Sequence, residues 1–288
     1  MAYRSSPRPV FDGPTPIPYA QVTRHLWGDA EAGQIDDWIY VSTDRIHQLV
    51  FGMAPGQGFR HSESYRTVFG ADEVLTVLMG TMIIANPETG EVHVVRTGES
   101  VFFGKDTWHH AFAWGAEECR VLEYFAPPPS TGSSGKYAAT RPYVADFRYE
   151  RRELTGHWPA ARAEAEAKAR IRVIREADWL WSLDQDNRVL TGIMASTGQL
   201  TAGAVRISPG GKSDLRRHDG ALGLYLRRGR LNILIEDADI SPVWFELHPQ
   251  DGFYIPPGTA YRAVNMGGEE VDYLFGVAPR YAPADGPG

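Results

Sequence analysis

Alternating apolar and polar residues recur along most of the chain, and this pattern predicts β-strands. In the first half, four segments alternate in this way: residues 37–52 (DWIYVSTDRIHQLVFG), 72–86, 92–103 and 119–126. Turn signals such as Pro55-Gly56 and residues 86–90 (NPETG) separate these segments. Short strands at this spacing favour an all-β sandwich or barrel.

The pattern changes in the middle of the chain and then returns. Residues 127–137 (PPPSTGSSGKY) are rich in Pro, Ser and Gly, which is typical of a linker. Residues 159–177 are Ala-rich, begin with a proline and carry charge pairs spaced four apart, so they predict a helix. From about residue 188 the strand pattern resumes and continues to residue 281.

The two strand-rich parts look like copies of one domain. Gly80, which ends VLTVLMG, has a counterpart in Gly229, which ends LGLYLRRG, 149 residues later. His109 in the segment GESVFFGKDTWHH has a counterpart in Tyr261, 152 residues later. Landmarks in the same order at a nearly constant offset favour duplication of a whole domain.

These landmarks resemble the motifs of the cupin superfamily. The resemblance implies an all-β fold of two tandem jelly-roll β-barrels joined by a helical linker. It divides the chain into an N-terminal arm (1–36), a first, metal-binding cupin domain (37–128), a linker with a helix (129–187) and a degenerate second cupin domain (188–281).

In the first copy, the resemblance implies a metal site made by four residues. Glu73 and Gly80 have the glutamate-to-glycine spacing of the first cupin motif, and His109 stands at the histidine of the second motif. His61 falls near the first expected histidine, and Glu63 occupies the place of the next one. The longer gap before Glu73 implies an inserted loop.

In the second copy, most of these ligand types are missing. The corresponding positions hold Arg216, His218, Leu222 and Tyr261. One potential ligand of four remains, so we expect no metal in the second barrel.

Strand geometry makes a metal site in the first copy physically reasonable. Residues two apart on a strand point the same way, so His61 and Glu63 can both face the barrel interior. Imidazoles with one or two carboxylates form a mixed nitrogen and oxygen site. Such a set suits one Fe(II) ion per chain, which we favour, and Zn, Ni, Mn or Co are alternatives. Glu63 could equally act as a general base.

Other residues near these motifs are candidates for substrate contact. Tyr65 and Arg66 lie in the inserted loop, and Phe103 and Trp108 lie beside the second motif. Packing is the competing interpretation for each of them. His110 should point away from His109 on a regular strand, which favours packing or a supporting hydrogen bond.

Charge and cysteine content narrow the class of protein. The net charge is -7 and the Lys and Arg residues are scattered, which argues against binding of nucleic acid. The single cysteine, Cys119, fits a reducing cytoplasm, and no apolar run reaches the ~20 residues that span a membrane. We therefore expect a cytoplasmic protein without membrane contact.

The leading functional hypothesis is a metal-dependent dioxygenase acting on a small oxygenated or aromatic substrate, because two-domain cupins include ring-cleaving dioxygenases. A non-redox isomerase, cyclase, lyase or decarboxylase could use the same site, with the metal polarising a carbonyl. A non-catalytic binding protein is the third alternative. The resemblance also implies a homodimer.

Overall fold

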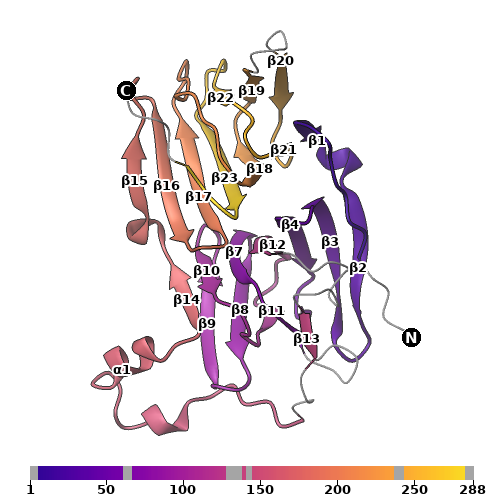
Figure 1. Ribbon diagram of the computed structural model, residues 1–288. Coiled ribbons are helices and arrows are strands. Elements are labelled where there is room, and N and C mark those ends of the chain that lie inside the picture. The colour runs from indigo at the N-terminus through magenta and orange to yellow at the C-terminus, as the bar shows by residue number, and fades with distance from the viewer. Residues whose placement is uncertain (1–5, 61–66, 128–137, 141–144, 237–242, 283–288) are drawn as a thin grey trace.

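Strands form where the sequence alternates, and they build two β-barrels that lie against each other (Figure 1). The computed structural model describes residues 6–60, 67–127, 138–140, 145–236 and 243–282. The all-β fold predicted from the sequence is confirmed. None of the helices within these ranges has the length and apolar character needed to cross a bilayer.

The first barrel consists of a large antiparallel sheet, a smaller sheet facing it, and a two-stranded ribbon. The large sheet has the order β14 (Ile171–Ile174), β10 (Ser100–Phe103), β7 (Asp72–Met79), β12 (Cys119–Ala126), β4 (His47–Met53), β3 (Gly33–Ser42), β2 (Thr23–Asp29). The small sheet has the order β5 (Gly58–Phe59), β11 (His110–Ala113), β8 (Thr81–Asn86), β9 (Glu91–Arg96). The ribbon pairs β13 (Ala138–Thr140) with β6 (Thr67–Phe69).

The second barrel repeats this plan. Its large sheet has the order β1 (Thr15–Ile17), β21 (Gly252–Ile255), β18 (Ala221–Arg228), β23 (Val271–Ala278), β17 (Thr201–Ile207), β16 (Val189–Ser196), β15 (Leu180–Leu183). Its small sheet has the order β20 (Val243–Leu247), β19 (Leu231–Ile235), β22 (Tyr261–Val264). Short 3-10 turns lie at Tyr19–Gln21, Arg152–Leu154 and Glu176–Asp178.

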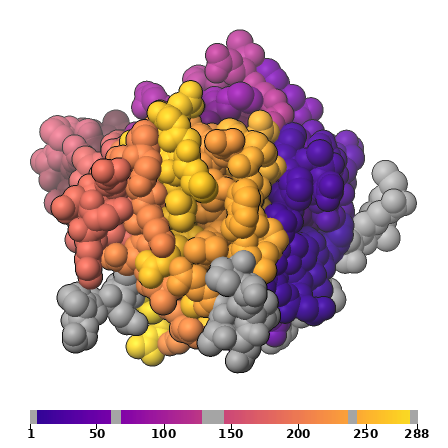
Figure 2. Space-filling model, turned by 90° about the horizontal axis from the view of Figure 1, so that it is seen from above, coloured from indigo at the N-terminus to yellow at the C-terminus, as the bar shows by residue number. Residues whose placement is uncertain are grey.

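Each large sheet takes one strand from the segment that precedes the other barrel. β1, from the N-terminal segment, pairs with β21 of the second barrel, and Figure 2 shows this segment lying along the second half of the chain. β14, from the segment between the barrels, pairs with β10 of the first barrel. The predicted N-terminal arm is therefore only partly correct, since β1 and β2 make it part of both large sheets.

The predicted helix over residues 159–177 is wrong for most of its length. The helix α1 covers only Arg162–Ala167, and Ile171–Ile174 form the strand β14. The sequence RIRVIR alternates with a period of two and contains β-branched residues, which suits a strand. Burial of Ile171 in the first barrel fixes the segment as a strand, although the alanines before it favour a helix.

The two large sheets pack face to face and bury both of their faces. On β12, Val121 faces the interior of its own barrel, whereas Leu122 and Tyr124 join a cluster shared by both barrels. On β23, Phe275 and Leu274 divide in the same way. Because successive side chains on a strand point to opposite faces, these strands carry nearly continuous apolar sequence.

Glycines on the second sheet allow tyrosines of the first sheet to approach closely. A Cβ atom added at Gly276 would lie 2.5 Å from the ring of Tyr124, and one at Gly252 would lie 2.4 Å from the ring of Tyr40. The Tyr40 hydroxyl donates to the carbonyl of Gln250 across the interface at 2.7 Å. Aromatic rings thus lie directly on backbone at the centre of the contact between barrels.

We expect Gly276→Ala to lower the free energy of unfolding by about 1–3 kcal/mol, because the added methyl group has to displace the buried ring of Tyr124. Gly268→Ala is the control, since a Cβ atom there meets open space. Chemical denaturation, monitored by tryptophan fluorescence, measures the free energy of unfolding of both variants. Equal stability of the two variants would contradict the close packing of the interface.

Candidate functional site

Of the four predicted metal ligands, Glu73 and His109 lie within the described residues. His61 and Glu63 lie outside them, as do the predicted substrate contacts Tyr65 and Arg66. Within the described ranges, no three His, Cys, Asp or Glu side chains are grouped so that they could hold a metal ion. A metal centre in the first barrel therefore depends on residues 61–66 and stays a prediction.

Glu73 lies at the start of β7 with its side chain in the interior of the first barrel. It is 2% exposed, and its cross-strand neighbours are Phe103 on β10 and Phe125 on β12. One carboxylate oxygen, Oε2, is buried and has no hydrogen-bond partner. A buried acceptor without a donor costs free energy unless a cation or proton satisfies it, so Glu73 fits the role of a metal ligand.

His109 lies just before β11 and reaches the same end of the barrel. Its ring is 4.4 Å from the ring of Phe103, which is also the cross-strand neighbour of Glu73. The ring of Phe59 lies 5.6 Å away on another side. Phe103 thus connects the two predicted ligands that the structure describes.

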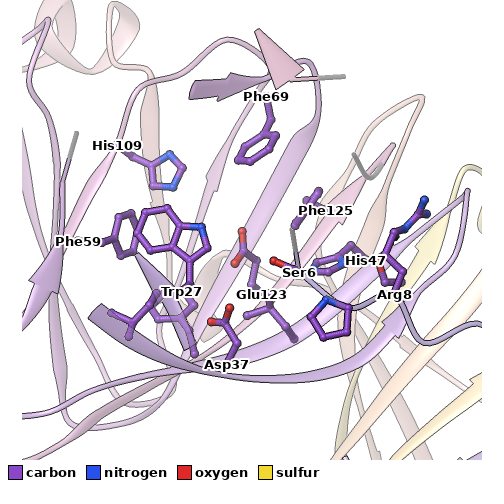
Figure 3. Close-up of a pocket in the computed structure, with 15 residues that line it drawn as sticks. Ser6, Arg8, Trp27, Asp37, His47, Phe59, Phe69, His109, Glu123 and Phe125 are labelled. Carbon is purple, nitrogen blue, oxygen red and sulfur yellow. Dashed lines mark hydrogen bonds between the residues drawn. The ribbon is translucent and has the colours of Figure 1, made fainter. Parts of the chain in front are cut away.

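A cavity of about 110 Å³ opens beside His109 inside the first barrel (Figure 3). Its walls are mainly aromatic: Trp27, Phe51, Phe59, Phe69 and Phe125. Its polar lining includes Arg8, Asp37, His47, His109 and Glu123. The volume has room for several waters or a small organic molecule, and an apolar wall with a few polar groups is typical of ligand pockets.

Two carboxyl groups in the cavity, Glu123 and Asp37, were not among the predicted site residues. The Glu123 carboxyl is close enough to that of Glu73 to share a hydrogen bond with it. Burial raises the pKa of both glutamates, the negative charge of Glu123 raises that of Glu73 further, and the shared hydrogen bond lowers that of Glu123. Burial, then the charges of Glu123 and Asp36, raise the pKa of Asp37.

Sequence alternation contains a signal for both residues. Val121, Glu123 and Phe125 share the inward face of β12, and Ile35 and Asp37 share the inward face of β3. A charged residue at an inward position of an otherwise apolar face is costly unless it has a role. Such positions can be recognised once the inward face of each strand is known.

The N-terminal segment closes the other end of the cavity. Arg8 donates to the carbonyl of Thr43 at 2.5 Å and lies 3.4 Å from the hydroxyl of Ser42. The same hydroxyl lies 2.8 Å from Nδ1 of His47. Burial, followed by the charge of Arg8, lowers the pKa of His47 to about 3, so this histidine is neutral.

Two further predicted residues do not reach the cavity. Phe103 and Trp108 are fully buried, and neither is part of the cavity lining. Phe103 instead packs against His109. His110, for which we expect packing or a supporting hydrogen bond, is buried on β11 with its Nδ1 2.7 Å from the hydroxyl of Tyr149.

In the second barrel, a buried ion pair occupies the corresponding positions. Arg216 is 3% exposed, and its Nη2 donates to both carboxylate oxygens of Asp184 at 2.9 and 3.0 Å. The same nitrogen donates to the hydroxyl of Thr191 at 2.9 Å. The charge of the guanidinium is thus balanced inside the barrel.

Aromatic packing fills the rest of this space. His218 Nε2 lies 3.1 Å from the hydroxyl of Tyr261, and the His218 ring stacks on Tyr281 at 4.8 Å. Leu222, at the glutamate position, is buried among apolar residues. The side chains at the predicted ligand positions are therefore engaged with one another and with their neighbours.

We expect Arg216→Met to lower the free energy of unfolding by about 3–5 kcal/mol, because it leaves the buried carboxylate of Asp184 without its counter-ion. The double variant Arg216→Met/Asp184→Leu removes both charges, so its free energy of unfolding should fall less than that of the single variant. Denaturant titration compares the three proteins. A double variant less stable than the single variant would show that the ion pair itself stabilises the barrel.

Burial, followed by the charge of Arg216, lowers the pKa of His218 to about 4. A histidine with a lowered pKa stabilises the fold fully above the unfolded pKa of about 6.5, and this stability is lost as the pH falls towards 4. Relative to His218→Gln, the protein should therefore lose about 2 kcal/mol between pH 7 and pH 5. Denaturant titration of both proteins at pH 7 and pH 5 tests this. If the difference between their free energies of unfolding is the same at the two pH values, the prediction is contradicted.

Comparisons with known proteins agree with this architecture. Residues 203–277 match the Cupin domain family. Oxalate decarboxylase from Bacillus subtilis at pH 4.6 is similar in structure, with a TM-score of 0.62, 14% identity and coverage of 95% of this chain and 78% of that chain. The Lactobacillus farciminis oxalate decarboxylase formate complex is also similar, with a TM-score of 0.62 and 14% identity. The match covers 95% of this chain and 88% of that chain. No curated protein sequence matches the chain.

At this level of identity, the structural likeness concerns the fold. The family match lies in the second barrel, and the structural matches extend over both barrels. Residues 203–277 are therefore a Cupin domain, and the chain as a whole has a fold of two barrels similar to that of these oxalate decarboxylases.

Proposed function

We propose that the chain is a metal-dependent enzyme that carries out non-redox proton-transfer chemistry on a small molecule in the first barrel. Isomerases, lyases and decarboxylases belong to this class. The observation that carries the proposal is Glu123, a carboxyl that lines the cavity and contacts the predicted ligand Glu73. This carboxyl is additional to the predicted metal ligands, so it is available to hold or move a proton.

The metal would be one divalent cation bound by His61, Glu63, Glu73 and His109. The buried oxygen of Glu73 without a hydrogen-bond partner supports this assignment. When bound, the metal acts as a Lewis acid towards a substrate oxygen. The preference for Fe(II) over Zn, Ni, Mn or Co stays part of the proposal.

The residues around the cavity would supply binding, exclusion of water and proton transfer. Trp27, Phe59 and Phe125 form apolar walls that favour an apolar substrate surface and keep water out. Glu123 would exchange a proton with the bound substrate. Its contact with Glu73 holds it beside the metal ligands.

The relatives in structure give the proposal some further support. The two compared structures are of enzymes named oxalate decarboxylases, and decarboxylation belongs to the proposed class. A dioxygenase is the second candidate. The aromatic walls of the cavity favour it, because they suit the ring of an aromatic substrate.

The metal is tested first by elemental analysis of protein purified without chelator. We expect about one divalent metal per chain and at least a tenfold loss of affinity in Glu73→Gln and His109→Ala. Glu118→Gln is a control, because Glu118 pairs with Arg120 near the surface. Full metal content in both site variants would contradict the proposed centre.

The chemistry is tested by following a panel of oxo, hydroxy and amino acids and catechols by proton NMR in D2O, with metal-loaded protein under nitrogen and under air. We expect conversion under nitrogen and a loss of roughly 10²–10⁴-fold in Glu123→Gln at unchanged metal content. Conversion only under air would favour the dioxygenase. Bound metal without conversion of any compound would favour a binding protein.

A further inference from the structure

Asp37 is a buried carboxyl that points into the cavity of the first barrel (Figure 3). It lies on β3 opposite Phe51 of β4 and is 5% exposed. Among the described residues, no lysine, arginine or backbone amide pairs with its side chain, and its charged neighbours are the acids Glu123 and Asp36. A carboxyl at such a site is stable only if it holds a proton or if a cation compensates its charge.

The centre of the cavity has an excess of negative charge. Asp37 and Glu123 both line it and lie near each other in Figure 3. The cation of the lining, Arg8, is at the other end, where its guanidinium binds the carbonyl of Thr43 and points away from Glu123. His47 beside it is neutral.

Aromatic rings surround the two carboxyls. The rings of Trp27 and Phe59 pack edge to face at 5.7 Å, and Phe69 lies across the cavity from them in Figure 3. Aromatic faces attract cations through their quadrupole, and the attraction grows when water is excluded. Carboxylates among such rings favour a positively charged ligand over a neutral or negative one.

We propose that the cavity binds its substrate through a protonated amine, with Asp37 as the residue that pairs with the ammonium group and the aromatic rings around it as further contacts. This proposal rests on the proposed function, since it takes the cavity as the substrate site. It names the substrate class as a small organic amine or amino compound. Asp37 is then a residue that determines specificity, whereas Glu123 is the residue that moves a proton.

An ammonium group explains the site better than a hydroxyl or a carboxylate. A hydroxyl can donate one hydrogen bond to Asp37 but leaves its charge uncompensated. A substrate carboxylate in the same place would add a third negative charge. The burial and neighbouring negative charge that raise the pKa of Asp37 are the conditions that a cation relieves.

The test is calorimetric titration of the full chain at pH 7 with three probes of similar shape: benzylammonium, benzyl alcohol and benzoate. Methylammonium is a smaller fourth probe. We expect benzylammonium to bind roughly 10- to 100-fold more tightly than benzyl alcohol, as for a hydrogen-bonded charge pair. Benzoate should bind more weakly still.

Asp37→Asn should lose this preference for the amine while keeping its affinity for benzyl alcohol. Asp36→Asn is the matched control, because Asp36 is the exposed neighbour on the opposite face of β3. Benzoate binding as tight as that of benzylammonium would overturn the proposal, and so would an unchanged amine affinity in Asp37→Asn. Absence of binding by both ammonium probes would also overturn it.

The outcome is separable from that of the proposed function. Glu73→Gln removes a predicted metal ligand but leaves Asp37 in place, so binding of benzylammonium should persist in that variant. Metal content in Asp37→Asn should equal that of the unmodified chain. Normal metal binding with no preference for the amine would overturn only the substrate assignment.

Discussion

The packing of the two large sheets against each other is the constraint on which the rest of the structure depends. Each sheet has one face in its own barrel and the other in the cluster shared by both barrels. Tyr124 on Gly276 and Tyr40 on Gly252 show how closely the backbones approach. Because apolar burial on the outer faces contributes much of the stability, the interior of the first barrel can include polar groups that would otherwise be too costly.

The two barrels differ in how the charged side chains in their interiors are compensated. In the first, Glu123 and Asp37 line a cavity in which the guanidinium of Arg8 binds the carbonyl of Thr43 and pairs with neither carboxyl among the described residues. In the second barrel, Arg216 forms an ion pair with Asp184, and tyrosines fill the rest of the interior near these residues. A buried carboxyl needs a proton or a cation. In the second barrel the cation is a residue of the chain, and in the first barrel the proposed substrate amine would supply it.

Much of the fold could be predicted from the sequence. Alternation correctly predicted strands within residues 37–52, 72–86, 92–103 and 119–126, and the repeated glycines indicated the second copy. Gly80 and Gly229 both have positive φ and lie against backbone, which is why they recur. The strand β14 was missed because its partner β10 is distant in sequence, and local composition says nothing of that pairing.

The candidate site was harder to predict than the fold. Glu73 and His109 follow from motif spacing, and both lie at the end of the barrel where the cavity opens. Asp37 and Glu123 belong to no motif, because their importance comes from strands that converge only in three dimensions. Trp108 is adjacent to His109 in sequence and Phe103 precedes it by a short turn, yet both side chains are buried by packing and do not line the cavity.

The exchanged strands β1 and β14 bear on how the two barrels of the chain can differ. Each half lends its leading strand to the other, as two identical subunits do when they swap arms about a twofold axis. The chain thus has the organisation of a strand-exchanged dimer within a single polypeptide. Because the two halves occupy different positions of one sequence, a substitution in one barrel leaves the other unchanged, so the interiors of the two barrels can differ.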